Sequence, residues 1–142
     1  MPRPRDQVGA LPWRRGPGFQ VLLITSRETG RWLIPKGWPM AGLTDAQSAA
    51  REAAEEAGVE GRIEEKALGS YAYVKFAKSG EGFACKVQVF PLEVERTLSS
   101  WREKGQRRLW WTSPEEAAAA VLEKGLSRLI RRFAKSSSTA RG

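Results

Sequence analysis

Three glutamates stand close together in a stretch that is otherwise rich in alanine. Glu52, Glu55 and Glu56 have the spacing i, i+3, i+4, which places all three on one side of an α-helix. Clustered carboxylates repel one another, and their hard oxygens are the donors that Mg²⁺ and Mn²⁺ prefer. The spacing therefore indicates either a divalent-metal site or, in the simpler interpretation, the solvated face of a helix built from good helix formers.

The composition removes the main alternatives to metal and carboxylate chemistry. The 142-residue chain has no histidine, which excludes Ser-His-Asp triads, Cys-His pairs and histidine metal ligands. Its single cysteine, Cys85, excludes an internal disulfide and a cysteine zinc site. Cys85 alternates with apolar strand positions and is expected to be inert. Catalysis would therefore use carboxylates, lysines, tyrosines or a bound metal.

A well-delimited helix over residues 45–57 is expected to position the glutamates. Thr44 with Gln47 fits a capping box, and Gly58 followed by Val59 is typical of a helix end. The opposite side of this helix carries alanines, which allow it to approach a sheet closely and so fix where the carboxylates point. These alanines are Ala46, Ala50, Ala53 and Ala57.

The other elements predicted from periodicity and turn residues make a single domain over residues 1–142, with an ordered core at about residues 7–133. Strands are predicted over residues 7–13, 21–24, 32–34, 62–76, 85–94 and 107–111, with Pro35 to Pro39 ending the third. A helix is predicted to begin after Ser113, a second one spans about residues 126–134, and residues 136–142 are expected to be a disordered tail.

The chain is basic, with a net charge of +8, and the excess is unevenly distributed. Residues 1–15 carry +3 and residues 102–142 carry +6, whereas residues 16–101, which include the glutamates, carry −1. A basic chain favours polyanionic partners. No apolar run approaches the length of a membrane span, and no signal-peptide pattern is seen, so we expect a cytoplasmic protein without membrane association.

The letters around the glutamates carry more information than their spacing. Gly37, thirteen further residues and then the segment from Arg51 to Val59 resemble the Nudix box. Residues 21–27, 31–37 and 105–111 look like the diphosphoinositol polyphosphate phosphohydrolase branch of that family. Residues 35–37 are also similar to diadenosine polyphosphate hydrolases, so the resemblance leaves the substrate open between these two classes.

The resemblance implies an α/β fold, the Nudix α/β/α sandwich around a central mixed sheet, and a Mg²⁺-dependent pyrophosphohydrolase for which Mn²⁺ can substitute. Glu52, Glu55 and Glu56, with the Gly37 carbonyl, would ligate the metal, and Arg51 would pair with a carboxylate. The general base would be Glu52 or Glu56, and a loop glutamate is the alternative. The loop candidates are Glu103 and Glu81.

Substrate phosphates are expected to contact Arg31, Lys36 and Lys86, which lie on or beside strands that border the metal site. Arg107 and Arg108 match the family segment, but an exposed arginine pair is the more ordinary interpretation. Tryptophans are usually part of the core, and stacking on a purine is the alternative. The four considered for stacking are Trp32, Trp38, Trp110 and Trp111.

One position departs from the family pattern. The pattern has a glutamate six residues after the glycine, where this chain has Leu43. In the family this acid often supports the arginine, so its loss weakens the expected metal site. Together with the basic ends, Leu43 motivates an alternative function as a non-catalytic or RNA-binding Nudix scaffold. Three intact helix carboxylates beside Arg51 favour the enzyme, whose partner is a small polyphosphate rather than nucleic acid.

Overall fold

The computed structural model describes residues 3–140, which form eight strands and three helices. The strands are β1 (Arg5–Arg14), β2 (Gln20–Thr25), β3 (Trp32–Leu33), β4 (Lys36–Gly37), β5 (Val59–Ile63), β6 (Gly69–Phe76), β7 (Gly82–Thr97) and β8 (Leu109–Thr112). The helices are α1 (Asp45–Ala57), α2 (Pro114–Ala120) and α3 (Lys124–Ala140). Among these residues, no helix has the length and apolar character needed to cross a membrane.

A single mixed sheet runs through the middle of the molecule. Its main path is β3-β2-β1-β7-β5, with β4 paired to β1, β6 to β7 and β8 to β2. The long strands β1 and β7 are parallel, and every other pair is antiparallel. β1 holds the centre because nearly all of it is buried, so both its faces must be covered by other elements.

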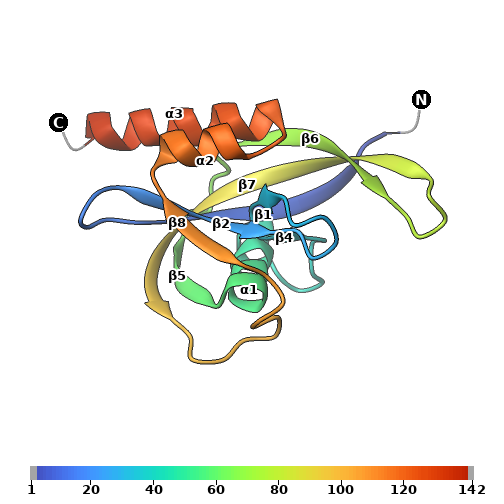
Figure 1. Ribbon diagram of the computed structural model, residues 1–142, viewed down its shortest axis with the longest axis horizontal. Helices are drawn as coiled ribbons and strands as arrows, with labels where there is room; N and C mark the ends of the chain where they lie inside the picture. The colour runs from blue at the N-terminus through green and yellow to red at the C-terminus, as the bar shows by residue number, and fades with distance from the viewer. Residues whose placement is uncertain (1–2, 141–142) are drawn as a thin grey trace.

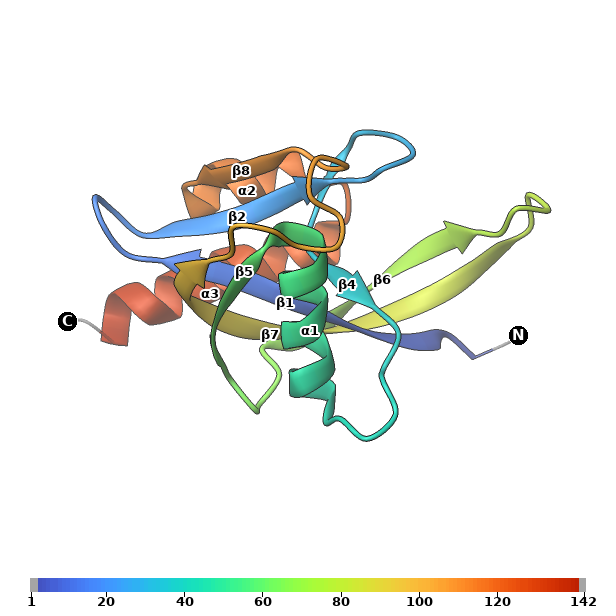
Figure 2. The same cartoon turned by 90° about the horizontal axis from the view of Figure 1, so that it is seen from below.

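Helices cover both faces of the sheet, which confirms the predicted α/β/α sandwich (Figure 1). α1 lies on one face, where its alanines pack against residues of the sheet such as Val8, Ala10 and Phe90. α2 and α3 lie on the other face, where Leu126, Leu129 and Ile130 share a core with Leu11, Val87 and Val89. Figure 2 turns the molecule so that α1 is in front of the sheet and α3 is behind it.

The predicted α1 is confirmed from end to end. Thr44 accepts from the Gln47 backbone N–H at 3.1 Å, and the Gln47 side chain accepts from the Thr44 N–H at 2.9 Å. Gly58 ends the helix with φ 68°, a conformation that favours glycine. The buried alanines are Ala46, Ala49, Ala53 and Ala57, so the contact stripe is slightly rotated from the predicted one, and Ala50 is only partly buried.

Three segments differ from the sequence-based expectations. The predicted strand over residues 62–76 is two strands, β5 and β6, which pair with different parts of β7. Residues 35–39 do not simply end a strand, because β4 within them pairs with β1. α3 runs to Ala140, through most of the predicted tail. With no glycine or proline after Gly125 until Gly142, each further residue adds a helical hydrogen bond. Residues 141–142 lie outside the described part.

Candidate active site

The short strand β4 brings its backbone against two of the predicted glutamates. Gly37 packs so closely on Glu52 that a Cβ added to Gly37 would overlap the Glu52 carboxylate. One residue earlier, the Lys36 backbone N–H donates a hydrogen bond of 3.2 Å to Glu56 Oε1. Only a residue without a side chain leaves room for the carboxylate here. β4 therefore forms a cradle that holds the carboxyl groups of Glu52 and Glu56 in place.

The carboxyl groups of Glu52 and Glu56 are both at least partly buried from solvent. Burial raises the pKa of Glu52 to about 8, and a hydrogen bond with Glu56 and the negative charge of Glu56 act in the same direction. Burial also raises the pKa of Glu56, but the nearby Arg107 guanidinium and the Lys36 N–H stabilise its ionised form. Ionised Glu56 is thus compensated by protein groups, whereas ionised Glu52 is not. The two ionised carboxylates together would therefore carry more negative charge than the neighbouring positive groups compensate.

This imbalance predicts a pH-dependent stability of the metal-free protein. The pKa of Glu52 is about 8 in the folded state, and its ordinary value is 4.5. The stabilisation of the fold by the protonated Glu52 carboxyl is therefore complete below pH 4.5 and is lost as the pH rises through 8. Because the carboxyl is half-exposed, we expect a loss of only about 1 kcal/mol after solvent screening. Urea unfolding in EDTA should show wild-type stability falling relative to Glu52→Gln over this range; parallel curves would contradict the assignment.

Arg107 connects the site to the loop between β7 and β8. Its guanidinium lies 3.9 Å from Glu56 Oε2, bonds Glu103 at 2.8 Å and donates to the Thr25 carbonyl at 2.9 Å. The side chain is about nine-tenths buried, whereas Arg108 is exposed. The ordinary interpretation of an exposed pair is therefore wrong for Arg107. The matching family segment was the available signal, but only the fold brings residue 107 against residues 25 and 56.

Replacing Arg107 with methionine should destabilise the fold by about 2–4 kcal/mol, because it removes the cation that bonds Glu103 and lies beside Glu56 in a buried setting. The more exposed Arg27, 3.6 Å from Glu103, replaces only part of this interaction. Arg108→Met is the matched control. The Arg108 guanidinium lies 5.6 Å from the centre of the Trp32 ring, which is a weak contact. Losing it should therefore cost less than about 1 kcal/mol. Urea unfolding of both variants measures the difference. Similar losses in the two would show that Arg107 does not bridge these segments.

The other carboxylates considered from the sequence fall into two groups. Glu103 lies beside the site, because its backbone N–H donates to the Glu55 carbonyl at 3.0 Å and its negative charge contributes to the raised pKa of Glu52. The loop that carries it crosses the end of α1 in Figure 2. Glu81 is exposed in the turn between β6 and β7, which both views place away from α1. The structure thus excludes Glu81 from the carboxylate cluster.

Glu55 does not join the other two glutamates in this conformation. It faces Arg102, with 3.7 Å between Glu55 Oε1 and the guanidinium. Within residues 3–140, no three acidic, cysteine or histidine side chains are arranged closely enough to hold a metal ion. The structure therefore brings together two of the three predicted ligands, and the metal site stays a prediction.

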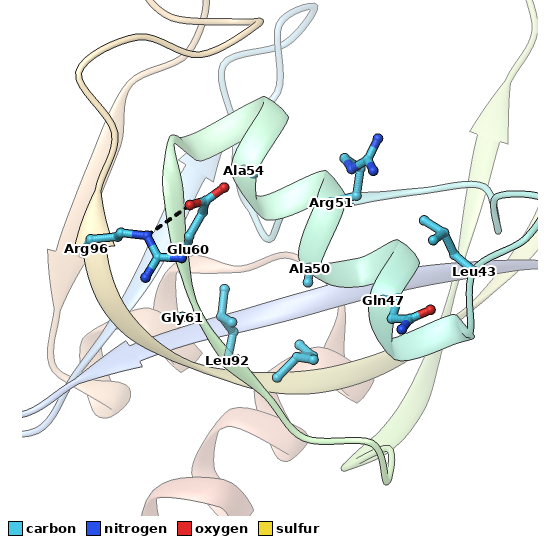
Figure 3. Close-up of a pocket in the computed structure, with 10 residues that line it drawn as sticks. Leu43, Gln47, Ala50, Arg51, Ala54, Glu60, Gly61, Leu92 and Arg96 are labelled. Carbon is cyan, nitrogen blue, oxygen red and sulfur yellow. Dashed lines mark hydrogen bonds and ion pairs between the residues drawn. The ribbon is translucent and has the colours of Figure 1, made fainter.

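Arg51 lies on the other flank of α1, in the wall of a pocket of about 370 Å³ (Figure 3). It is exposed and forms no ion pair within residues 3–140, so the expected pairing with a carboxylate is not found. Leu43, which lines the same pocket, explains this, because it stands where the family pattern has the supporting acid. The opposite wall holds Arg96, which bonds Glu60 at 3.0 Å.

Two of the three predicted phosphate contacts line one pocket. Arg31 and Lys36 both border a cavity of about 510 Å³ that Lys75 also lines. Burial lowers the pKa of Lys36, whose ammonium lies 4.6 Å from the centre of the Tyr73 ring. Lys86 is exposed on β7 and does not line this cavity. The sequence missed Glu123, which bonds Arg31 at 2.7 Å, because 92 residues separate the two.

The tryptophans considered for base stacking do not line this cavity. Trp32 and Trp110 pack against each other with ring centres 5.1 Å apart, and both contact the core under α2 and α3. Trp111 packs against the core on the α1 side and lies 4.1 Å below the Arg14 guanidinium. Trp38 is partly exposed. Cys85 is buried, in agreement with the expected core position.

Comparisons with known proteins show the family of this chain. The NUDIX domain family matches residues 3–133. Nudix hydrolase 13, mitochondrial, of Arabidopsis thaliana is 33% identical over 130 residues, covering 85% of this chain and 64% of the relative. Nudix hydrolase 18, mitochondrial, of the same plant is 31% identical over 144 residues, covering 91% and 78%. This chain thus spans less than two thirds of the first relative's length.

Solved structures share the fold. An Ap4A hydrolase from C. elegans in a binary complex has a TM-score of 0.69 at 23% identity, over 95% of this chain and 98% of that chain. The NUDIX domain of Shewanella oneidensis NrtR, complexed with ADP ribose, has a TM-score of 0.66 at 15% identity, over 94% and 90%. The box resemblance seen in the sequence is confirmed by the family match, and the sandwich by these structures. This chain belongs to the Nudix hydrolase family.

Proposed function

We propose that this protein is a metal-dependent pyrophosphohydrolase that cleaves a diphosphate bond in a highly phosphorylated small molecule. The substrate classes suggested by the sequence are diphosphoinositol polyphosphates and diadenosine polyphosphates. One observation carries the proposal: the two residues of β4 join the carboxylate pair to the cationic pocket. The Lys36 N–H and Gly37 contact the glutamates, while the Lys36 side chain lines the pocket.

The oxygens of the carboxylate pair are the type of donor that a divalent cation such as Mg²⁺ prefers. Glu56 is buried and Glu52 half-buried, and their carboxylate oxygens are short of compensating positive charge. Together with Glu55 and the Gly37 carbonyl they are the groups that would hold Mg²⁺, with Mn²⁺ as a substitute. A bound ion would neutralise phosphate charge and lower the pKa of the attacking water. The name of the family's C. elegans structural neighbour, an Ap4A hydrolase, supports a dinucleoside polyphosphate as one substrate.

Other groups of this chain would bind the substrate phosphates, orient the carboxylates and accept a proton. Lys36 would bind a phosphate at the edge of the carboxylate pair, because its partly desolvated ammonium is poorly compensated there. Arg107 and the Lys36 N–H orient the Glu56 carboxylate and favour its ionised form, against the burial that raises its pKa. Glu52 and Glu56 are the two candidate bases, and the raised pKa of Glu52 in the metal-free protein would fall when a cation neutralises the pair.

A hydrolysis panel tests the proposal. Purified protein with Mg²⁺ or with EDTA is given diadenosine polyphosphates, diphosphoinositol polyphosphates, nucleoside triphosphates, ADP-ribose and 5′-triphosphorylated RNA, and phosphate products are measured. We expect Mg²⁺-dependent cleavage of at least one class. Salt-sensitive RNA binding with no metal-stimulated hydrolysis would favour the scaffold function instead. β1 begins on the side of the molecule opposite the end of α3, but its other end meets α3, where the rings of Trp13 and Phe133 lie 5.9 Å apart (Figures 1 and 2).

The cytoplasmic location belongs to the same proposal. The curated relatives include proteins named as mitochondrial and chloroplastic, so the comparisons do not support one compartment. Imaging of the tagged protein in its own cells tests the location.

A further inference from the structure

Glu123, the residue before α3, lines the pocket that holds Arg31 and Lys36, and one of its carboxylate oxygens is buried without a partner in the described part of the chain. Its side chain is about nine-tenths buried, and its Oε2 bonds the Arg31 guanidinium at 2.7 Å. Its other oxygen, Oε1, is buried without a hydrogen-bond partner in the described part of the chain. A buried acceptor without a donor costs folding free energy, which native structures avoid unless the group has a use. The free oxygen therefore points to a ligand that brings a donor.

The other residues that line the pocket indicate which chemical class of ligand would fit it. Three large apolar side chains that line it are unusually exposed: Val74 at 55%, Phe76 at 68% and Leu122 at 73%. Flat apolar groups such as nucleobases cover surfaces of this kind. The cations Lys36 and Lys75 lie on the same pocket, so a ligand with an apolar ring and a phosphate chain matches both parts.

The carboxylate of Glu123 separates the two candidate substrate classes. A diphosphoinositol polyphosphate carries negative acceptor oxygens around its whole ring, and these repel a carboxylate and give it no hydrogen. The amino group of a nucleobase is neutral and donates, and a hydrogen bond to a charged acceptor is a strong one. Oε1 is buried here, but rotation about the last torsion of a glutamate is soft, so the carboxylate can turn to present an oxygen to such a donor and stay beside Arg31.

We propose that Glu123 is a specificity-determining residue whose free oxygen accepts a hydrogen bond from the amino group of the base in a nucleoside polyphosphate. The phosphates of that substrate then extend past Lys36 toward Glu52 and Glu56. Arg31 positions Glu123 instead of binding phosphate. The proposal rests on the hydrolase function proposed above, and it selects nucleoside polyphosphates over diphosphoinositol polyphosphates as the substrate class.

Equilibrium binding in EDTA tests this without requiring catalysis. The probes are ATP and purine riboside 5′-triphosphate, which lacks only the amino group of the base, and calorimetry gives both dissociation constants. The wild-type protein should bind ATP at least tenfold more tightly. In Glu123→Gln, the Arg31 guanidinium can only donate, so it takes the amide oxygen and leaves the amide NH₂ toward the pocket. The amide NH₂ then faces the amino group of the base, and both can only donate. The preference for ATP over purine riboside 5′-triphosphate should therefore fall to about one or below.

Glu64→Gln is the matched control, because Glu64 is exposed and does not line this pocket. It removes the same charge and should keep the wild-type ratio. Equal binding of the two probes by the wild-type protein overturns the proposal, and this arm holds even if Glu123→Gln fails to fold. An unchanged ratio in folded Glu123→Gln also overturns it.

A hydrolysis arm separates this proposal from the proposed function. Mg²⁺-dependent cleavage that prefers diphosphoinositol polyphosphates, and that rises in Glu123→Gln, overturns the role of Glu123 while the hydrolase stands. An absence of hydrolysis with any polyphosphate, alongside a tenfold preference for ATP that Glu123→Gln abolishes, overturns the hydrolase while base recognition stands.

Discussion

Glu52→Gln and Glu56→Gln should each lower kcat/KM for the best substrate of the hydrolysis panel by on the order of 10³-fold or more, with the fold intact. Each substitution removes a negative oxygen donor while keeping the shape of the side chain, and metal charge stabilisation amounts to several kcal/mol in such reactions. Steady-state kinetics at saturating Mg²⁺ measure the loss. A second expected sign is that Mg²⁺ raises the Tm of the wild type and not of the variants.

Protein stability distinguishes this loss from unfolding. Because the pKa of Glu52 is raised by burial and by Glu56, neutral glutamine at position 52 relieves repulsion, and Glu52→Gln should be no less stable than the metal-free wild type at pH 8. Glu64→Gln, at an exposed position, is the control that removes the same charge and should leave turnover unchanged. Turnover within tenfold of the wild type in both active-site variants would refute the proposed hydrolase mechanism.

Gly37→Ala should reduce kcat/KM by on the order of 10²-fold, because a catalytic group displaced by about 1 Å costs that much. The added Cβ overlaps the Glu52 carboxylate, which must move. The obstructing atoms are the far end of a flexible side chain and the backbone of Gly37 needs no left-handed conformation, so the fold should accept alanine. Kinetics with the best panel substrate and thermal unfolding of the same sample check both expectations.

Gly18→Ala is the matched control, because a Cβ there meets nothing within 4 Å and the backbone has no positive φ. A double variant sharpens the test. If Gly37→Ala acts by displacing Glu52, then adding it to Glu52→Gln should cause little further loss, since both substitutions remove the same group from its place. Independent, multiplying losses would mean that Gly37 acts in another way, for example through its own carbonyl.

Local features of the chain are those that the sequence predicted well. The limits of α1 follow from Thr44, Gln47 and Gly58, and all of them act within a few residues of one another. The start of α2 at Ser113 is confirmed for the same reason, with a 3.2 Å bond from the Glu116 N–H to the serine hydroxyl. Apolar runs predicted the buried strands, but not that residues 62–76 divide, because strand pairing depends on partners elsewhere in the chain.

In the candidate site, the sequence determined the identity of the carboxylates and the side of the helix that carries them. It did not determine that Glu52 and Glu56 meet while Glu55 turns to Arg102, because rotamers follow from neighbours brought by other elements. Arg51 illustrates the same limit. Its place in the box predicted an ion pair, yet the described chain has none there, and Leu43 stands at the position of the supporting acid in the family pattern.

Only the tertiary structure decided the remaining contacts. Arg107 meets Thr25 across 82 residues of sequence, and Glu123 meets Arg31 across 92. Such pairs leave no periodic signal, because periodicity records only whether a residue faces the core or the solvent. Their geometry arises when β2, β4, α1 and the loop before β8 pack around one sheet. The sequence by itself thus determined the chemistry available to this protein, and the packing of distant segments decided which groups share one site.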